Sequence, residues 1–205
     1  MNIAVFVSGK GSNLEAILAS AELKGLCDVS MVCSDKLDCP AFEIAKRYKI
    51  PFLSVCESEK DGFVTFNKLH QIFTEKEIGL IVLAGFLKLM PKEFVRAFPN
   101  KIINIHPALL PSFGGKGMYG IRVHEAVFKS SAKVSGATVH FVNENYDEGL
   151  IIDQAAVSTE DVESPEEIAQ RVLQLEHVLL PSVIVKFAQR KIEIKNNRVY
   201  LTKKS

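Results

Sequence analysis

The chain has 205 residues, of which 47% are hydrophobic and 24% are charged, as in ordinary globular proteins and unlike disordered, collagenous or coiled-coil chains. Lys and Arg total 25 against 24 Asp and Glu, and this net charge of +1 supplies no general attraction to nucleic acid or an anionic membrane. No apolar run approaches the roughly 20 residues that span a bilayer. These properties predict a single globular domain over residues 1–205.

Strand and helix patterns alternate through the first half of the chain. Short apolar runs bounded by turn residues predict buried strands over 2–7, 27–33, 51–55, 80–84 and 101–105. Apolar residues at helical spacing predict the intervening helices over 12–24, 40–48, 62–76 and 91–98. This alternation is typical of an α/β doubly wound sheet, mostly parallel, with helices on both faces.

The second half has a different pattern. Strands are predicted over 134–142 and 150–157 with only a turn-rich loop between them, so they should be antiparallel neighbours. An N-cap serine and an acidic first turn predict the longest helix, over 165–189. A small hairpin is predicted over 191–201, with its turn at Asn196-Asn197.

The cysteines indicate a reducing environment. They stand at positions 27, 33, 39 and 56 without a CxxC pair, and no histidine has finger spacing. Four free thiols, buried or half-buried, are therefore expected in a cytoplasmic protein, with no metal site.

The turn after the first strand, Ser8-Gly9-Lys10-Gly11-Ser12-Asn13, lies where open parallel sheets bind ligands. Two glycines permit close backbone approach, and the N-terminus of the following helix attracts an anion. Leu14 replaces the third glycine of a dinucleotide fingerprint, and no Walker lysine follows. A monophosphate therefore fits better than NAD or ATP. The alternative is a tight turn in which Ser12 or Asn13 merely caps the helix.

A strand end presents an amide beside an imidazole. Asn104 and His106 are two residues apart at the end of a buried strand, before Pro107, and therefore point the same way. An amide can stabilise an oxyanion, and an imidazole can move protons near neutral pH. The alternative is a histidine that merely bonds a neighbouring carbonyl.

Two later loops contain further candidate site residues, but the sequence does not distinguish between the possible roles of these residues. Residues 114–120 are glycine-rich and predict either a mobile flap over the site or a plain flexible loop. In the acidic loop 143–149, Glu144, Asp147 and Glu148 are equivalent by spacing; any of them can face His106 and raise its pKa. His140 lies inside a strand, where a structural role is favoured.

These segments together resemble the folate-dependent phosphoribosylglycinamide formyltransferase family over almost the whole chain. The resemblance rests on Ser8-Gly9-x-Gly11-Ser12-Asn13, Val82-Leu83-Ala84-Gly85-Phe86, Asn104-Ile105-His106-Pro107, Leu109-Leu110-Pro111, His140-Phe141-Val142 before Asp147, and Glu176-His177. It implies a Rossmann-like fold with a seven-stranded mixed sheet. The implied reaction moves the formyl group of 10-formyltetrahydrofolate to the amine of 5-phosphoribosylglycinamide, in de novo purine biosynthesis.

The resemblance also implies roles for particular residues. Asn104, His106 and Asp147 would be catalytic, which selects Asp147 from the acidic loop. The ribonucleotide would be held by Gly11, Ser12, Asn13 and Glu176, although Glu176 by itself suggests an exposed helix charge. The folate would be bound by Leu87, Lys88, Leu89, Met90, Asn104, Asn143 and Glu144. Formyltetrahydrofolate would be a co-substrate, with no tightly bound cofactor and no metal.

Other readings of the sequence predict different partners. Methionyl-tRNA formyltransferase and formyltetrahydrofolate hydrolase share the core, but the length and charge of this chain favour neither. An NAD-dependent oxidoreductase is disfavoured by Leu14, and a non-enzymatic nucleotide-binding module would not need the amide, imidazole and carboxylate. We expect small-molecule substrates, no nucleic acid or membrane partner, and a monomer or weak homodimer.

Overall fold

The computed structural model describes residues 1–202. The chain divides into two compact units, Met1–Asn104 and Ile105–Ser205, each of which is described by itself. The single-domain expectation stays a prediction.

The first unit is built on parallel strands. In spatial order they are β4 (Val64–Thr65), β3 (Phe52–Cys56), β2 (Asp28–Ser34), β1 (Asn2–Val7), β5 (Ile78–Leu83) and β6 (Ile102–His106). Each neighbouring pair is parallel. The central strand β1 is buried on both faces from Ile3 to Val7, which explains its continuous apolar sequence.

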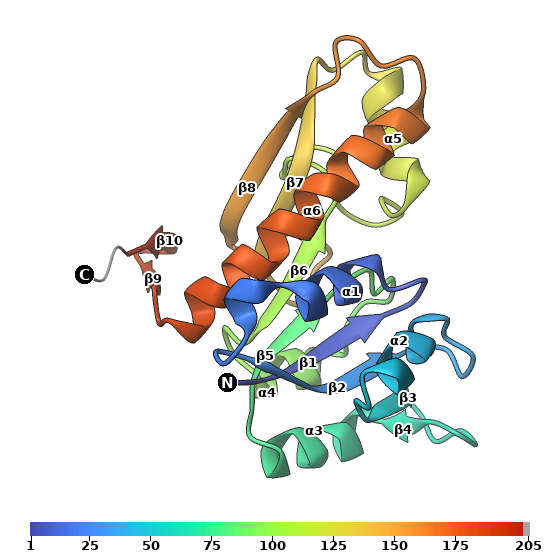
Figure 1. Cartoon of the computed structure of the whole chain (residues 1–205), viewed down its shortest axis with the longest axis vertical. Helices are drawn as coiled ribbons and strands as arrows, with labels where there is room; N and C mark the ends of the chain where they lie inside the picture. Colours follow the sequence, from blue (N-terminus) through green and yellow to red (C-terminus); the bar gives the residue numbers. More distant parts are fainter. Residues whose placement is uncertain (203–205) are drawn as a thin grey trace. The chain divides into compact units, whose positions relative to one another are not determined.

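Helices join these strands (Figure 1). They are α1 (Ser12–Ala19), the short 3₁₀ helix at Ala21–Leu23, α2 (Ala41–Arg47), α3 (Phe66–Glu75) and α4 (Lys92–Ala97). The expected helix over 12–24 is thus divided, because Ser20 adopts an extended conformation after the first segment.

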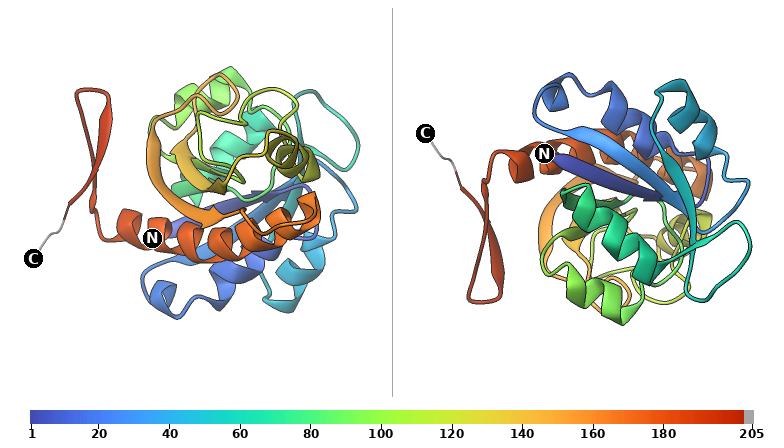
Figure 2. Two further views of the ribbon diagram at one scale, coloured as in Figure 1. Left: turned by 90° about the horizontal axis from the view of Figure 1, so that it is seen from above. Right: turned by 90° about the horizontal axis from the view of Figure 1, so that it is seen from below.

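An aromatic cluster packs α3 and α4 against β1. The rings of Phe66, Phe73, Phe86 and Phe94 all lie within 6.5 Å of the Phe6 ring, centroid to centroid. The Phe66 ring is stacked on Phe6, and the other three meet it edge to face; both arrangements add to the hydrophobic stabilisation of a core. Figure 2 shows α3 and α4 side by side, in agreement with their mutual contacts.

The helix predicted over 62–76 begins later than expected. Val64 and Thr65 extend the sheet as β4, paired with Val55 and Cys56 of β3, and the side chain of Thr65 caps α3 by accepting from the N–H of Lys68. This two-residue strand is too short to give a sequence period. It raises the number of strands in the sheet to eight, against the seven expected.

The second unit begins inside β6 and continues the strand order with β7 (Val134–Phe141) and β8 (Ile151–Ser158). These two strands are antiparallel neighbours, as predicted. The helix α6 (Pro165–Ala188) contacts both of them and α5 (Ile121–Lys129). The predicted fold class is confirmed, because the sheet is mostly parallel and is flanked by helices.

The helix α6 is long and apolar enough to cross a membrane by length and composition, with a mean hydropathy of 1.2 over its most apolar window. Half of that window is buried inside the protein, where Ile168, Val172, Leu180 and Ile184 are at most 1% exposed. Its apolar residues are therefore accounted for by packing in the core.

The chain ends in the predicted hairpin, β9 (Ile192–Lys195) and β10 (Arg198–Leu201). Asn196 and Asn197 both have positive φ, at 49° and 58°, as a tight hairpin turn requires. Helix α5, by contrast, was not predicted: it follows a glycine-rich loop, and only Val123, His124 and Val127 among its nine residues are buried.

Candidate active site

Strand β6 presents the predicted amide and imidazole. Asn104 is paired with Leu83 of β5, and His106 follows two residues later, so both side chains leave the same face of the strand. The imidazole of His106 is almost wholly buried, whereas Asn104 is half-buried. Asn104 ends the first unit, and His106 lies in the second.

Asp147 lies against His106 within the second unit. Its Oδ2 atom is 3.5 Å from Nδ1 of His106 and accepts a hydrogen bond of 2.9 Å from the N–H of Gly115. Its Oδ1 atom is 3.6 Å from Nε2 of His140. The structure thus selects Asp147 among the acidic-loop residues by contact, which spacing alone did not do.

Tight backbone geometry places this carboxylate. Asp147 itself has a positive φ of 57°, a conformation that Asp tolerates better than most residues. Gly149 follows, where a Cβ would lie 1.7 Å from the carbonyl oxygen of Phe141. At Gly114 a Cβ would come within 2.4 Å of the Leu110 side chain and 3.3 Å of Asp147. Glycine is therefore required at position 149, where backbone would collide, whereas at position 114 the end of the Leu110 side chain would have to move.

The carboxylate of Asp147 is stabilised in its ionised form. Burial raises its pKa, but the hydrogen-bonding contact with His140, the charge of His106 and the N–H of Gly115 lower it by more. The net pKa of Asp147 is therefore below its ordinary value, and the group is negatively charged at neutral pH.

The net pKa shift of His106 is opposite to the one expected from its carboxylate neighbour. Burial lowers its pKa most strongly, while Asp147 and the carbonyl of Phe113 raise it and His140 lowers it. The effect of Asp147 has the predicted direction, but the net pKa lies below the ordinary value. The Nε2 atom lies 2.8 Å from the carbonyl oxygen of Phe113; because a carbonyl only accepts, Nε2 carries the hydrogen.

A third histidine faces this cluster. His124 of α5 is buried, and its Nδ1 atom has no hydrogen-bond partner among the described residues. Burial, with a smaller contribution from His106, lowers the pKa of His124 to about 4. His124 is therefore neutral at physiological pH.

The predicted phosphate turn begins α1 in the first unit. Gly11 has a left-handed backbone, with φ 81°, and no side chain caps the helix there. A Cβ at Gly11 would lie 2.7 Å from Cβ of Ala41, so only glycine fits between the two helices. Because α1 begins at Ser12, the backbone N–H groups of Ser12 and Asn13 belong to its first turn. The N-terminus of a helix favours an anion.

The segment expected to contact folate follows β5. It is tied to the first turn, because the N–H of Leu87 donates to Oγ of Ser8 at 3.1 Å. Leu87 and Lys88 are exposed, whereas the side chain of Met90 is 2% exposed. Leu87 and Lys88 therefore offer side chains to a ligand, and Met90 supports the segment from the core.

Asn143 and Glu144, the other residues expected to contact folate, lie in the same loop as Asp147. The side chain of Asn143 accepts from the N–H of Asn145 at 3.0 Å, and Asn145 in turn donates to Glu148 at 2.7 Å. These bonds hold the loop, so Asn143 shapes the backbone around Asp147.

Glu176 lies in α6 and is only 7% exposed. The exposed helix charge that its sequence suggests is therefore wrong. The ligand role implied for Glu176 stays a prediction.

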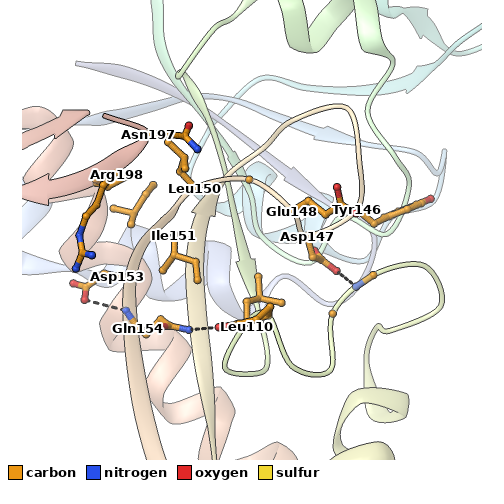
Figure 3. A pocket seen from close by; sticks show the side chains of 16 residues that line it. Leu110, Tyr146, Asp147, Glu148, Leu150, Ile151, Asp153, Gln154, Asn197 and Arg198 are labelled. Atoms are coloured by element: carbon orange, nitrogen blue, oxygen red, sulfur yellow. Dashed lines mark hydrogen bonds between the residues drawn. The ribbon is translucent and has the colours of Figure 1, made fainter. Parts of the chain in front are cut away.

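A cleft of about 1040 Å³ opens beside Asp147. Figure 3 shows it between the Leu110 corner, the acidic loop, β8 and the hairpin turn, where Arg198 points towards Asp153. Thr138 and Gln154 support the corner, since Gln154 donates to the carbonyl of Leu110 at 3.0 Å and to Oγ1 of Thr138 at 2.9 Å. Asp147 thus borders a space large enough for a small organic ligand.

The described residues offer less support for metal-dependent or cysteine-based catalysis. Within residues 1–202 no group of three or more His, Cys, Asp or Glu side chains could hold a metal ion. The four cysteines are free, with Cys33 and Cys39 buried and Cys27 and Cys56 half-buried, as predicted. Burial raises the pKa of the Cys33 thiol, which makes it a poor nucleophile.

Sequence reasoning missed three contributors to the site. The backbone N–H of Gly115 has no sequence signature, His124 lies on the helix that was not predicted, and His140 was assigned a structural role. The available signal for His140 was its position at the end of a strand just before the acidic loop.

Comparisons with known proteins give a consistent result. The profile of the formyl transferase family matches residues 1–184. The chain is 43% identical to the chloroplastic phosphoribosylglycinamide formyltransferase of Arabidopsis thaliana, over 97% of this chain and 69% of that protein. It is 36% identical to the phosphoribosylglycinamide formyltransferase of Bacillus subtilis, over 88% and 91%. The crystal structure of the Anaplasma phagocytophilum phosphoribosylglycinamide formyltransferase superimposes with a TM-score of 0.88 at 34% identity, over 100% and 96%.

Proposed function

Because the chain belongs to the formyl transferase family, we propose that it transfers the formyl group of 10-formyltetrahydrofolate to the amine of 5-phosphoribosylglycinamide. The products are N-formylglycinamide ribonucleotide and tetrahydrofolate, in de novo purine biosynthesis. The observation that carries the proposal is the buried His106–Asp147 contact at the end of β6, two residues beyond Asn104. An amide, an imidazole and a carboxylate are the groups that acyl transfer to an amine needs.

The amine of the ribonucleotide attacks the formyl carbon, and the carbonyl oxygen becomes negative in a tetrahedral intermediate. The amide of Asn104 and the Nε2–H of His106 donate to that oxygen. For this, the formyl oxygen replaces the Phe113 carbonyl as the acceptor from Nε2. Breakdown cleaves the bond between the formyl carbon and the folate nitrogen, so the formyl group remains on the amine.

Proton transfer is balanced within the reaction, because the attacking amine loses one proton and the leaving folate nitrogen gains one. Asp147 is ionised and borders the open cleft, so it is placed to order a water that carries this proton. The charge of the oxyanion raises the pKa of His106, and Asp147 faces Nδ1 to stabilise the second proton there. No metal is needed for these steps.

The remaining candidate residues bind substrates in this proposal. Gly11, Ser12 and Asn13 hold the ribose phosphate through the start of α1. Glu176 holds the glycinamide end of the ribonucleotide. The folate is contacted by Leu87, Lys88, Leu89, Met90, Asn104, Asn143 and Glu144.

The protein is proposed to use these small molecules without a tightly bound cofactor, nucleic acid or membrane. We propose the cytoplasm as its location, although the name of the Arabidopsis relative places that protein in the chloroplast. A monomer or weak homodimer is expected, which sedimentation velocity at two concentrations distinguishes.

A coupled assay tests the proposal directly. Purified protein is mixed with 10-formyltetrahydrofolate, with and without phosphoribosylglycinamide, and tetrahydrofolate formation is followed by absorbance. We expect product only when both substrates are present. Formate release without the ribonucleotide would instead indicate a hydrolase, and transfer to methionyl-tRNA would indicate the other related activity.

The roles of the two donors are tested in the same assay. Asn104→Ala and His106→Ala should each lower kcat on the order of 10²–10³-fold, the usual cost of losing one oxyanion donor. Circular dichroism confirms that the variants are folded. Turnover like that of the wild type in either variant contradicts the assignment.

A further inference from the structure

We infer that His140 is a positioning residue for Asp147: its imidazole faces Oδ1 of the carboxylate through Nε2 and leaves Oδ2 to His106. The inference rests on the proposed transferase function, because it concerns the same carboxylate. It assigns a role in the reaction to a residue that the sequence placed inside a strand as a structural histidine.

The backbone of β7 aims His140 at the acidic loop. His140 is 2% exposed, and the pairing of β7 with β8 shifts register at this point: Val139 pairs with Asp153, and His140 pairs with Ile151. Such bulges redirect a side chain and are frequent beside active sites. Here the shift occurs at the residue that faces Asp147.

Both ring nitrogens of His140 face oxygens. Nδ1 lies 2.7 Å from the carbonyl oxygen of Phe141, which only accepts, so Nδ1 carries a hydrogen. Nε2 lies 3.6 Å from Oδ1 of Asp147, an ionised oxygen that also only accepts. The ring of His140 is thus held between the carbonyl of Phe141 and the carboxylate of Asp147.

The two oxygens of Asp147 consequently have different partners. Oδ1 faces His140, while Oδ2 faces His106 and accepts from Gly115. Among the groups that favour the ionised carboxylate, His140 has the largest effect. Burial lowers the pKa of His106 most strongly, and His140 lowers it further.

The other ionisable groups around β7 are already paired or neutral. Asp153 of the neighbouring strand β8 is paired with Lys186 of α6. His124 of α5 has its pKa lowered to about 4, mainly by burial and to a smaller extent by His106, and is neutral.

The effect of His140 on Asp147 is measured without turnover. A ¹³C titration of the Asp147 carboxyl should give a higher pKa in His140→Gln than in the wild type, because the contact with His140 favours the ionised carboxylate. An unchanged Asp147 titration overturns the inference even in an inactive protein.

Kinetics test the effect on the reaction. His140→Gln keeps a side-chain N–H donor and loses the imidazole; we expect kcat to fall about tenfold, as for other partners that orient catalytic groups. The pH profile of kcat/KM should move to higher pH by about half a unit to one unit, because the pKa values of Asp147 and His106 both rise. His140→Ala, which loses the donor as well, should be slower still.

Ser135→Ala is the matched control. Ser135 is equally buried on the same strand, and its hydroxyl has no hydrogen-bond partner among residues 1–202. The control should retain the kcat and pH profile of the wild type. If His140→Gln slows the reaction with an unmoved pH profile and a lowered Tm, His140 is only structural. If His140→Gln does not fold, His140→Asn is used for the same measurements.

Discussion

The turn at the start of α1 and the cluster around Asp147 are both proposed to act on negative charge, but by different means. At the turn, Gly11 adopts a left-handed backbone before a helix whose N-terminus favours an anion. Around Asp147, buried imidazoles and one backbone N–H balance a carboxylate. The first site depends on backbone shape, and the second depends on where protons reside.

The difference teaches where each site is vulnerable. A backbone cradle is lost when a side chain blocks the approach of the helix, since the N–H groups cannot titrate. A buried charge cluster is lost when one member is neutralised, because the others then remain buried without compensation. Variants at the first site should therefore change substrate binding, and variants at the second should change rate and pH dependence.

The largest effect is expected for Asp147→Asn. Loss of the carboxylate removes the group that stabilises the second proton of His106 and orders the relay water, so kcat should fall on the order of 10²–10⁴-fold. The contact that raises the pKa of His106 is also lost, so the pH profile of kcat/KM should move to lower pH, opposite to the shift expected for His140→Gln.

Asp161→Asn provides the control, since Asp161 is an exposed carboxylate paired with Arg171. It should leave turnover unchanged. An unaltered pH profile in Asp147→Asn would count against the contact with His106.

A smaller effect, on stability, is expected at His124. Its folded-state pKa is about 4, against 6.5 for the unfolded chain. As pH falls through this range the unfolded state binds the proton and the folded state does not, so the wild type loses stability below about pH 6.5, by up to about 3 kcal/mol near pH 4. His124→Leu should not show this acid-induced decrease in the free energy of unfolding. The free energy is measured by urea unfolding at several pH values.

His70→Leu is the comparison for that measurement, because His70 is exposed on α3. It should follow the pH dependence of the wild type. Equal pH slopes for His124→Leu and the wild type would show that His124 does not carry the acid sensitivity.

The smallest effect is expected for Gly11→Ala, in the turn before α1, and it should appear in substrate binding and not in the rate of catalysis. Gly11→Ala places a methyl group 2.7 Å from Cβ of Ala41 at a positive φ of 81°, and the start of α1 must move. We expect KM for the ribonucleotide to rise about tenfold, equivalent to about 1.4 kcal/mol of binding energy, with kcat nearly unchanged.

Gly25→Ala is matched to that variant, because Gly25 has a similar φ of 76° but no atom within 4 Å of the added Cβ. It carries the backbone strain without the collision. If both variants raise KM equally, the effect comes from general destabilisation and the phosphate assignment is wrong.

The elements that the sequence predicted well are those whose burial is visible in local patterns. The strand over 2–7 was predicted with its observed bounds, since all of its residues after Asn2 are buried. The antiparallel pair β7 and β8 followed from the absence of a helix between two apolar runs. The two-residue β4 is too short to show a period. Helix α5 was also missed, although Val123, His124 and Val127 recur at helical spacing, because it directly follows the glycine-rich loop.

The residues of the candidate site also differ in how well a local sequence pattern predicts them. Asn104 and His106 were predicted from adjacency in one strand, because the two-residue period of a strand places them together whatever surrounds it. Asp147 was indistinguishable from Glu144 and Glu148 until a resemblance selected it, and its contact with His106 joins residues 41 positions apart in the chain. The burial of Glu176 also went against its polar sequence, because the partners that bury it come from elsewhere in the chain.

The sequence by itself determined the alternation of strands and helices, the glycine turn, and the presence of an amide beside an imidazole. These depend on residues within a few positions of one another, so local sterics and periodic burial decide them. Only the tertiary structure decided which carboxylate meets His106, that His140 faces its other oxygen, and that burial lowers the pKa of His106 despite Asp147. Those properties arise from desolvation and from charges brought together by folding, which no local pattern encodes.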